Sequence, residues 1–155
     1  MTKEKAQELI NVMKQILTKG VYYLPATGKM NTINLVSVQS QRDRFVIYVN
    51  RRSTIVPNKY TLILHYPEES LLRIDVNGSE HENPDGTRIA CPHIHMRMKD
   101  SGRWDQWAFE LPAIFGNSED CITTLKDFLQ YCHANNISEI VICEQKETEY
   151  ETSGN

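Results

Sequence analysis

The chain has 155 residues, of which 40% are hydrophobic and 24% charged, a composition typical of a globular protein with one well-buried core. Its formal net charge of −3 lacks the positive surplus of general nucleic-acid binders, so we expect no strong general nucleic-acid binding. No run of 18 or more apolar residues appears, and the N-terminus lacks the apolar core of a signal peptide. We therefore expect no membrane span and a cytoplasmic location. The four cysteines form no C-x-x-C motif, which favours reduced thiols over a disulfide framework.

The first expected element is a helix over residues 2–19, where apolar residues recur at helical spacing. Several strands follow, separated by turn-forming residues, at 21–24, 33–39, 44–50, 59–66 and 71–76. Two further strands are expected at 91–98 and 103–109, joined by a tight turn at residues 100–102. The second helix is expected over 119–134 and the last strand over 139–143.

Short connections between the strands imply mainly antiparallel pairing. We therefore predict an α+β fold, with one mainly antiparallel sheet of about six to seven strands. An N-terminal and a C-terminal helix should pack on one face of this sheet. The other face would be open to solvent or to a partner, so either a monomer or a homodimer is compatible with the pattern. The prediction is a single domain over residues 1–144, followed by a disordered tail over 145–155 that is polar and charged.

The segment 90–98 alternates strictly between two kinds of residue, which is typical of a half-buried strand. Cys91, His93, His95 and Arg97 fall on one side of it. Residues two apart on a strand are separated by roughly 6.5–7 Å. That spacing lets two imidazoles converge on one metal ion or flank one reacting group.

A loop with a further histidine precedes this strand. His81 lies in segment 77–88, which also contains the strong turn signal Asn-Pro-Asp-Gly at 83–86. If the flanking strands pair, Asp75, His81, His93 and His95 would lie near one another. Three neutral nitrogen donors suit zinc, with Asp75, Cys91, a loop carboxylate or water as the fourth ligand. Histidines exposed on a strand, without a metal, are the alternative interpretation.

A second hypothesis is catalysis without a metal. His93 and His95 would act as general acid and base on a phosphodiester, and Arg97 or Arg73 would stabilise the developing charge. This is the chemistry of a small metal-independent ribonuclease or toxin. It requires the two imidazoles to lie on opposite sides of the scissile phosphate.

Candidate partner-binding residues surround the same region. Segment 103–107 reads Arg-Trp-Asp-Gln-Trp, and tryptophan and arginine are favoured at interface hot spots. On a strand, the two tryptophans would face opposite sides, one toward the core and one toward solvent. We predict that a partner would contact Arg73, Arg97, Arg103 and Trp107.

Four segments of the sequence are distinctive, and they are RIDVNG at 73–78, HENPDG at 81–86, PHIH at 92–95 and WDQWA at 104–108. In these segments the chain resembles a family of small uncharacterised proteins found in phages and prophages of Gram-positive bacteria. The resemblance extends from the first helix to about residue 132 and is most specific between residues 73 and 108. A second similarity, in the order strand, loop histidine and His-x-His strand, is to TumE-like toxins and is compatible with the ribonuclease hypothesis.

Proteins with this genomic distribution are often anti-defence factors. The size, acidity and histidine cluster are also similar to those of a zinc-containing anti-CRISPR protein that binds a Cas9-type nuclease. The resemblance therefore implies a protein that inhibits a host defence enzyme by direct binding. In that case zinc would be structural, and would tie the long loop to the sheet and pre-organise a binding surface.

Overall fold

The computed structural model describes residues 1–145, and within them it contains two α-helices, one 3-10 helix and eleven strands. The predicted tail lies outside the described residues from 146 onward. Among the described residues, none of the helices has the length and apolar character needed to span a bilayer.

Seven strands form the main sheet, and every neighbouring pair in it is antiparallel. In spatial order they are β1 (Lys14–Ile16), β3 (Met30–Ser37), β4 (Arg44–Asn50), β5 (Tyr60–Tyr66), β6 (Glu69–Val76), β9 (His93–Met96) and β10 (Ala108–Glu110). The α+β fold predicted from the sequence, with its sheet of six to seven strands, is confirmed.

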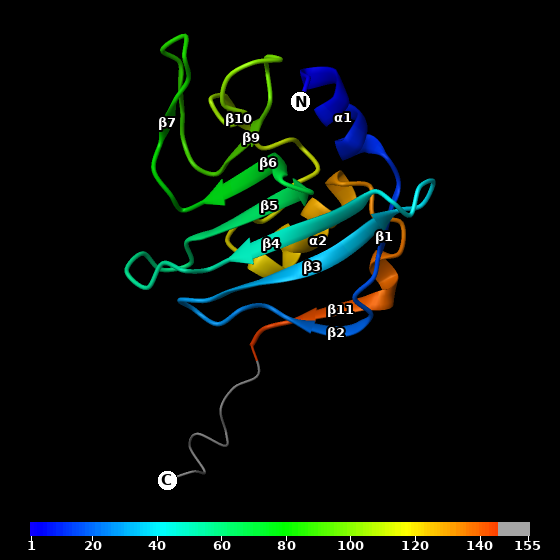
Figure 1. Cartoon of the computed structure of the whole chain (residues 1–155). Coiled ribbons are helices and arrows are strands. Elements are labelled where there is room, and N and C mark those ends of the chain that lie inside the picture. The colour runs from blue at the N-terminus through cyan, green and yellow to red at the C-terminus, as the bar shows by residue number, and fades with distance from the viewer. Residues whose placement is uncertain (146–155) are drawn as a thin grey trace.

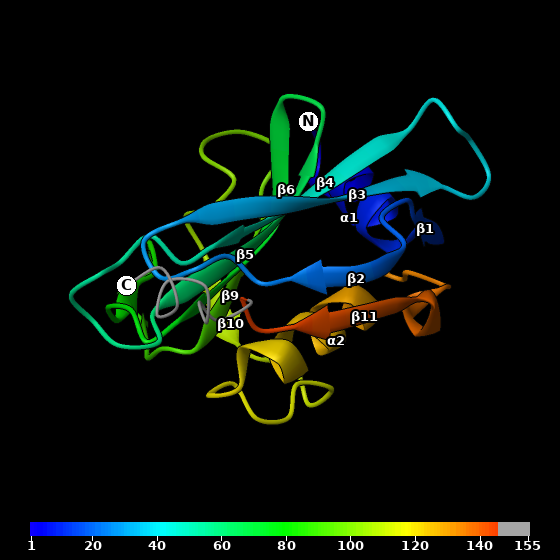
Figure 2. The ribbon, with the colours of Figure 1, turned by 90° about the horizontal axis from the view of Figure 1, so that it is seen from below.

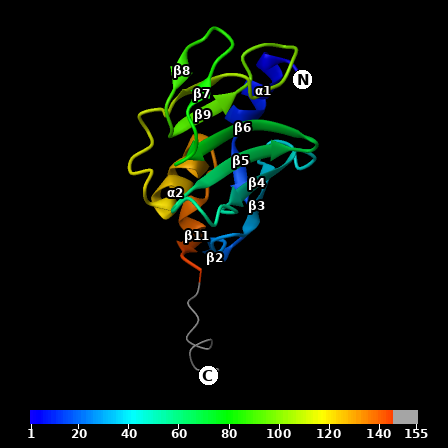
Figure 3. The ribbon, with the colours of Figure 1, turned by 90° about the vertical axis from the view of Figure 1, so that its left-hand side faces the viewer.

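The helices α1 (Lys3–Asn11) and α2 (Cys121–Tyr131) both cover one face of this sheet (Figures 1 and 3). The alternation along β5 explains why. Tyr60, Leu62 and Leu64 point toward the helices and are at most 1% exposed, whereas Thr61 and Ile63 are half-buried on the opposite face. The hydrophobic core therefore lies between the sheet and the helices, and the other face remains free for polar side chains.

Two smaller strand pairs complete the fold. β2 (Gly20–Tyr23) and β11 (Ile140–Cys143) are parallel and lie beside α2, with the 3-10 helix Ile137–Glu139 leading into β11 (Figure 2). β7 (His81–Glu82) and β8 (Arg88–Ile89) form a hairpin in the long connection between β6 and β9. Neither strand of this hairpin was expected from the sequence, because each has only two residues.

The first helix is shorter than predicted. It begins after Thr2, whose hydroxyl accepts a hydrogen bond from the Lys5 N–H at 3.0 Å, and it ends at Asn11 instead of residue 19. Val12 is extended, and β1 follows at once. The apolar spacing of Met13, Ile16 and Leu17 suits a helix, but pairing of β1 with β3 overrides this local preference.

The strand predicted at 103–109 is also wrong over most of its length. Only Ala108–Glu110 pair with β9, and residues 97–107 form an irregular loop, in which the Asp100 carboxylate accepts from the Lys3 N–H at the start of α1 and the Asp105 carboxylate pairs with Arg73. Trp104 and Trp107 are both half-buried in this loop, so they do not lie on opposite faces of a strand. Side-chain interactions of Arg103 and Asp105 fold the segment locally instead of extending it.

Candidate metal centre

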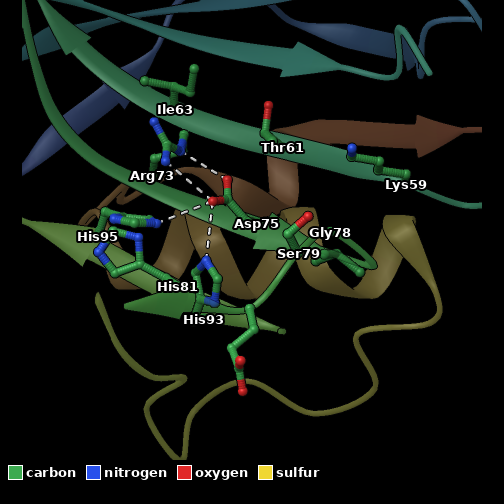
Figure 4. Close-up of a pocket in the computed structure, with 12 residues that line it drawn as sticks. Lys59, Thr61, Ile63, Arg73, Asp75, Gly78, Ser79, His81, His93 and His95 are labelled. Carbon is green, nitrogen blue, oxygen red and sulfur yellow. Dashed lines mark hydrogen bonds and ion pairs between the residues drawn. The ribbon is translucent and has the colours of Figure 1, made fainter. Parts of the chain in front are cut away.

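The candidate site lies on the free face of the sheet, where β6 and β9 run side by side (Figure 4). Their register places Arg73 opposite His95 and Asp75 opposite His93. Because side chains alternate along a strand, these four residues project from the same face. The alternation read from the sequence therefore places His93 and His95 together as predicted.

Asp75 is the centre of this cluster. Its Oδ2 lies 3.2 Å from the Nε2 of His93 and 3.2 Å from the Nε2 of His95. The Arg73 guanidinium donates to both carboxylate oxygens, at 2.8 and 3.2 Å. Burial alone would raise the pKa of Asp75, but the hydrogen bond that an imidazole donates when its Nε2 carries a proton, together with Arg73, outweighs it and holds that pKa well below its usual range.

The outer nitrogens of the two histidines are fixed by backbone carbonyls. The Nδ1 of His93 lies 3.3 Å from the Ala90 carbonyl oxygen, and the Nδ1 of His95 lies 3.0 Å from that of Asp105. A carbonyl oxygen only accepts hydrogen bonds, so both Nδ1 atoms carry the proton. In the neutral rings, each Nε2 then presents a lone pair toward Asp75.

The result is a convergence of acceptors. Two Nε2 lone pairs and a carboxylate oxygen meet at one point, and both imidazoles are only 1% exposed. Potential ligand atoms of Asp75, His93 and His95 all lie within 4.8 Å of one another. Such an arrangement needs a shared cation, which is either a proton on an imidazole or a metal ion. Zinc and other divalent transition metals are typically bound by such a donor set, which consists of two imidazole nitrogens and one carboxylate. The carbonyls that hold the opposite imidazole nitrogens are also typical of these sites.

His81 lies beside this triad, although its ligand atoms are not part of the group within 4.8 Å. Its ring centroid is 4.7 Å from that of His95 and 6.1 Å from that of His93, both in edge-on arrangements. Its Nε2 donates to the Gln106 carbonyl at 2.7 Å, which leaves Nδ1 as the acceptor in the neutral ring. The β7–β8 hairpin therefore brings the third predicted histidine to the site.

A residue that the sequence analysis assigned only to a turn holds this hairpin in place. The predicted turn is confirmed by the 2.8 Å bond from the Gly86 N–H to the Asn83 carbonyl. The Asn83 side chain is buried and makes two hydrogen bonds with the backbone of Ala108. Its Nδ2 donates to the Ala108 carbonyl at 3.1 Å, and its Oδ1 accepts from the Ala108 N–H at 2.8 Å. We call this pair of bonds the clip. The motif Asn-Pro-Asp-Gly signals a turn equally well with or without this clip, so nothing in the sequence identified it.

Replacing Asn83 with alanine should destabilise the protein by about 2–4 kcal/mol, because it leaves the buried N–H and C=O of Ala108 without partners. Urea denaturation would measure this loss. Asp85→Ala at the exposed tip of the same turn is the matched control, and it should cost less than about 1 kcal/mol. Equal losses in the two variants would contradict the role assigned to the clip.

The comparisons with known proteins concern most of the chain. Residues 1–134 match the model of DUF6978, which is described as a family of unknown function. The chain belongs to this family. This agrees with the membership of an uncharacterised family that the sequence motifs predicted. No curated protein and no solved structure matches the chain.

Besides His81 and Arg73, four predicted site residues in this DUF6978 chain lie outside the triad. The Cys91 thiol donates to the Asp75 backbone carbonyl at 3.2 Å, and burial raises its pKa, which is unfavourable for a thiolate ligand. Arg97 donates to carbonyls of its own loop, at Lys99 and Gly102. Arg103 is 78% exposed and pairs with Asp105, whereas Trp107 has a buried Nε1 with no hydrogen-bond partner among the described residues.

Arg73 belongs to the cluster itself. It links Asp75 to Asp105, whose Oδ2 lies 3.4 Å from its Nη1, and its guanidinium stacks 5.7 Å from the Trp104 ring centroid. Burial would raise the pKa of Asp105, but Arg103 and Arg73 outweigh it and lower that pKa. Arg73 thus ties the carboxylate of the triad to the 97–107 loop.

A groove of about 490 Å³ opens beside the triad in this DUF6978 fold. Asp75, His93 and His95 form part of its wall, together with residues from β5 and from the segment that follows β6 (Figure 4). The groove is lined by Lys59, Thr61, Ile63, Arg73, Asp75, Val76, Gly78, Ser79, Glu80, His81, His93 and His95. The three candidate ligands are therefore nearly buried and yet border a hollow that a small molecule can enter.

Proposed function

We propose that this protein is a zinc-binding, phage-type anti-defence protein, which acts in the cytoplasm of a bacterial host and inhibits a nuclease of the Cas9 type by direct binding. The convergence of two imidazole lone pairs and the Asp75 carboxylate oxygen supports the metal-binding part of the proposal. The resemblance to small proteins of phages and prophages supports the anti-defence part.

Zinc is the first candidate among divalent metals because it accepts mixed nitrogen and oxygen ligands without a strict geometric preference. The backbone carbonyls of Ala90 and Asp105 would orient the two imidazoles toward the ion. A metal at this point would bind residues of β6 and β9 directly. Through the Asp105 carbonyl, it would also fix the position of the 97–107 loop.

Such a metal would pre-organise a surface for a partner, which reduces the entropic cost of binding. Among the residues predicted to contact a partner, Arg103 is the most accessible, because its side chain is 78% exposed. Arg73 and Arg97 are engaged inside the fold, so their contribution to a partner surface would be indirect. The formal net charge of −3 suits contact with the basic surface of a nucleic-acid-binding enzyme.

The ribonuclease hypothesis has less support from the geometry. A metal-independent mechanism needs His93 and His95 on opposite sides of a phosphate. Their ring centroids are only 4.8 Å apart, and both Nε2 atoms face the same oxygen of Asp75. Their Nδ1 atoms are occupied by backbone carbonyls. A scissile phosphate therefore has no place between the two rings.

Metal analysis of the purified protein tests the proposal. We expect one equivalent of zinc in the wild type and none in the double variant His93→Ala and His95→Ala, because two of three ligands are lost. His65→Ala is the matched control, since His65 contacts Ser70 on the same sheet and lies outside the triad. Absence of zinc from the wild type after reconstitution would refute the metal-binding part.

The partner is tested separately. Zinc-loaded protein should form a stable complex with a Cas9-type nuclease and block DNA cleavage, and the double histidine variant should lose both effects. RNA cleavage by the purified protein, abolished by either single histidine change, would instead favour the ribonuclease.

A further inference from the structure

The groove beside the triad carries an uncompensated positive charge. Of the charged residues in its wall, Asp75 pairs with Arg73, and Glu80 pairs with Arg88 at 2.9 Å. Lys59 has no ion pair within residues 1–145. Neither its ammonium group nor the hydroxyls of Thr61 and Ser79 have a hydrogen-bond partner there. These three polar groups lie on the same side of Asp75 (Figure 4).

Lys59 lies beside the backbone that follows β6. The residue is half-buried, and its Cε lies 3.8 Å from the place that a Cβ on Gly78 would take, which is an ordinary van der Waals distance. The end of the lysine stem therefore passes next to Gly78. Partial burial of the stem restricts the side chain and lowers the entropic cost of using its ammonium group for binding.

The donor set also leaves room for a ligand at the metal. Structural zinc sites are typically closed by four protein ligands, whereas sites that bind an exchangeable group have three. Within residues 1–145, the group within 4.8 Å contains only Asp75, His93 and His95, and all three border the groove. A divalent ion there would add two positive charges to a wall in which Lys59 is already unpaired.

We infer that this groove binds a small oxyanion, a phosphate ester or a carboxylate, whose charged group contacts both the metal centre and Lys59, with Thr61 and Ser79 as hydrogen-bond donors. The inference rests on the proposed metal binding and adds the ligand class. The volume of about 490 Å³ is within the usual range for small-molecule sites. A second hollow of about 240 Å³ shares Lys59 and Thr61 and extends toward the exposed Arg52, which gives room for the remainder of the ligand.

Cobalt(II)-substituted protein provides a direct test, because its visible spectrum reports changes in coordination. The probes are phenyl phosphate, benzoate and, as the uncharged control, benzyl alcohol. We expect phenyl phosphate, benzoate or both to change the spectrum in a saturable way while cobalt remains bound, and benzyl alcohol to have no effect. The two anions distinguish a phosphate ester from a carboxylate as the preferred ligand.

Lys59→Gln should weaken binding of the anion by about tenfold or more, because it removes a charge-assisted hydrogen bond. Its cobalt content should remain at the level of the wild type. Lys126→Gln, at an exposed position of α2 on the opposite side of the sheet, is the charge-matched control and should bind as the wild type does.

The outcomes separate the two proposals. If the wild type does not bind cobalt, both the proposed metal binding and the proposed anion site are overturned. Stoichiometric cobalt with a spectrum that neither anion changes would overturn the anion site alone. Anion binding that is equal in the wild type and Lys59→Gln would also overturn it, since the lysine would then have no part in recognition.

Discussion

Replacing Asp75 with asparagine should abolish zinc binding and leave the metal-free protein folded, with a modest loss of stability. The amide removes the anionic ligand, and we expect the affinity for zinc to fall by at least about a hundredfold, more than for the loss of an outer-sphere group. The amide nitrogen can donate to an imidazole lone pair, and the amide oxygen can still accept from Arg73. The free energy of unfolding without metal should therefore fall by only about 1–3 kcal/mol, the contribution of the charged pairing with Arg73 that also lowers the pKa of Asp75.

Titration with zinc and thermal unfolding would measure both effects. Zinc at a hundred times its dissociation constant should raise the free energy of unfolding of the wild type by about 2.7 kcal/mol. The same zinc concentration should not raise that of Asp75→Asn in this way. Asp105→Asn is the matched control, because Asp105 also pairs with Arg73 but its carboxylate does not face the histidines. Equal zinc affinity in the wild type and Asp75→Asn would show that the carboxylate is not a ligand.

The strand patterns in the sequence were informative because period-two alternation is a direct consequence of which face is buried. Residues 44–50 were predicted with the bounds that the structure has, and β5 and β6 differ by only one or two residues. The same alternation placed His93 and His95 on the face that carries the site. Because successive side chains of a strand point to opposite faces, burying one face of the sheet fixes which residues point to the other.

The parts of the fold and of the site that were not predicted depend on contacts between distant parts of the chain, which no local sequence pattern encodes. β1 exists because it pairs with β3, and the 97–107 loop is folded by pairs such as Arg73 with Asp105. The carbonyls that orient the two imidazoles are backbone atoms, so they have no signature in the sequence. Cys91 alternates with the histidines as predicted, yet its thiol turns to the Asp75 backbone, because the regular strand begins only at His93.

Lys14 illustrates the same point in the core. It follows the helix that ended early, it is completely buried, and its ammonium lies 4.7 Å from the Phe45 ring centroid. It donates to the carbonyls of Ile10 at 2.8 Å, Val12 at 3.0 Å and Cys132 at 2.8 Å. These carbonyls lie at the C-terminal ends of both helices, where the helix itself provides no donors. The lysine therefore joins α1 and α2 at one point.

Replacing Lys14 with methionine should destabilise the protein by about 2–4 kcal/mol at pH 7.5, because three buried carbonyls lose their donor. The effect should grow with pH. Burial lowers the pKa of Lys14 to about 8, against an influence of Cys132 that raises it, whereas the unfolded chain keeps a value of about 10.4. Between these two pKa values the unfolded state binds more protons than the folded state. The contribution of Lys14 to the free energy of unfolding therefore increases as the pH rises, and this increase is lost as the pH falls through about 8.

Urea denaturation at pH 7.5 and 9.5 would measure the difference in the free energy of unfolding between wild type and Lys14→Met. This difference should increase by roughly 1–2 kcal/mol over the interval. Subtracting the variant removes the contributions of tyrosines and cysteines that also titrate there. Lys126→Met, at an exposed position, should differ from the wild type by the same amount at both pH values. A difference for Lys14→Met that does not change with pH would mean that the buried ammonium keeps its proton, because the three carbonyls and the Phe45 ring would then outweigh the cost of its burial.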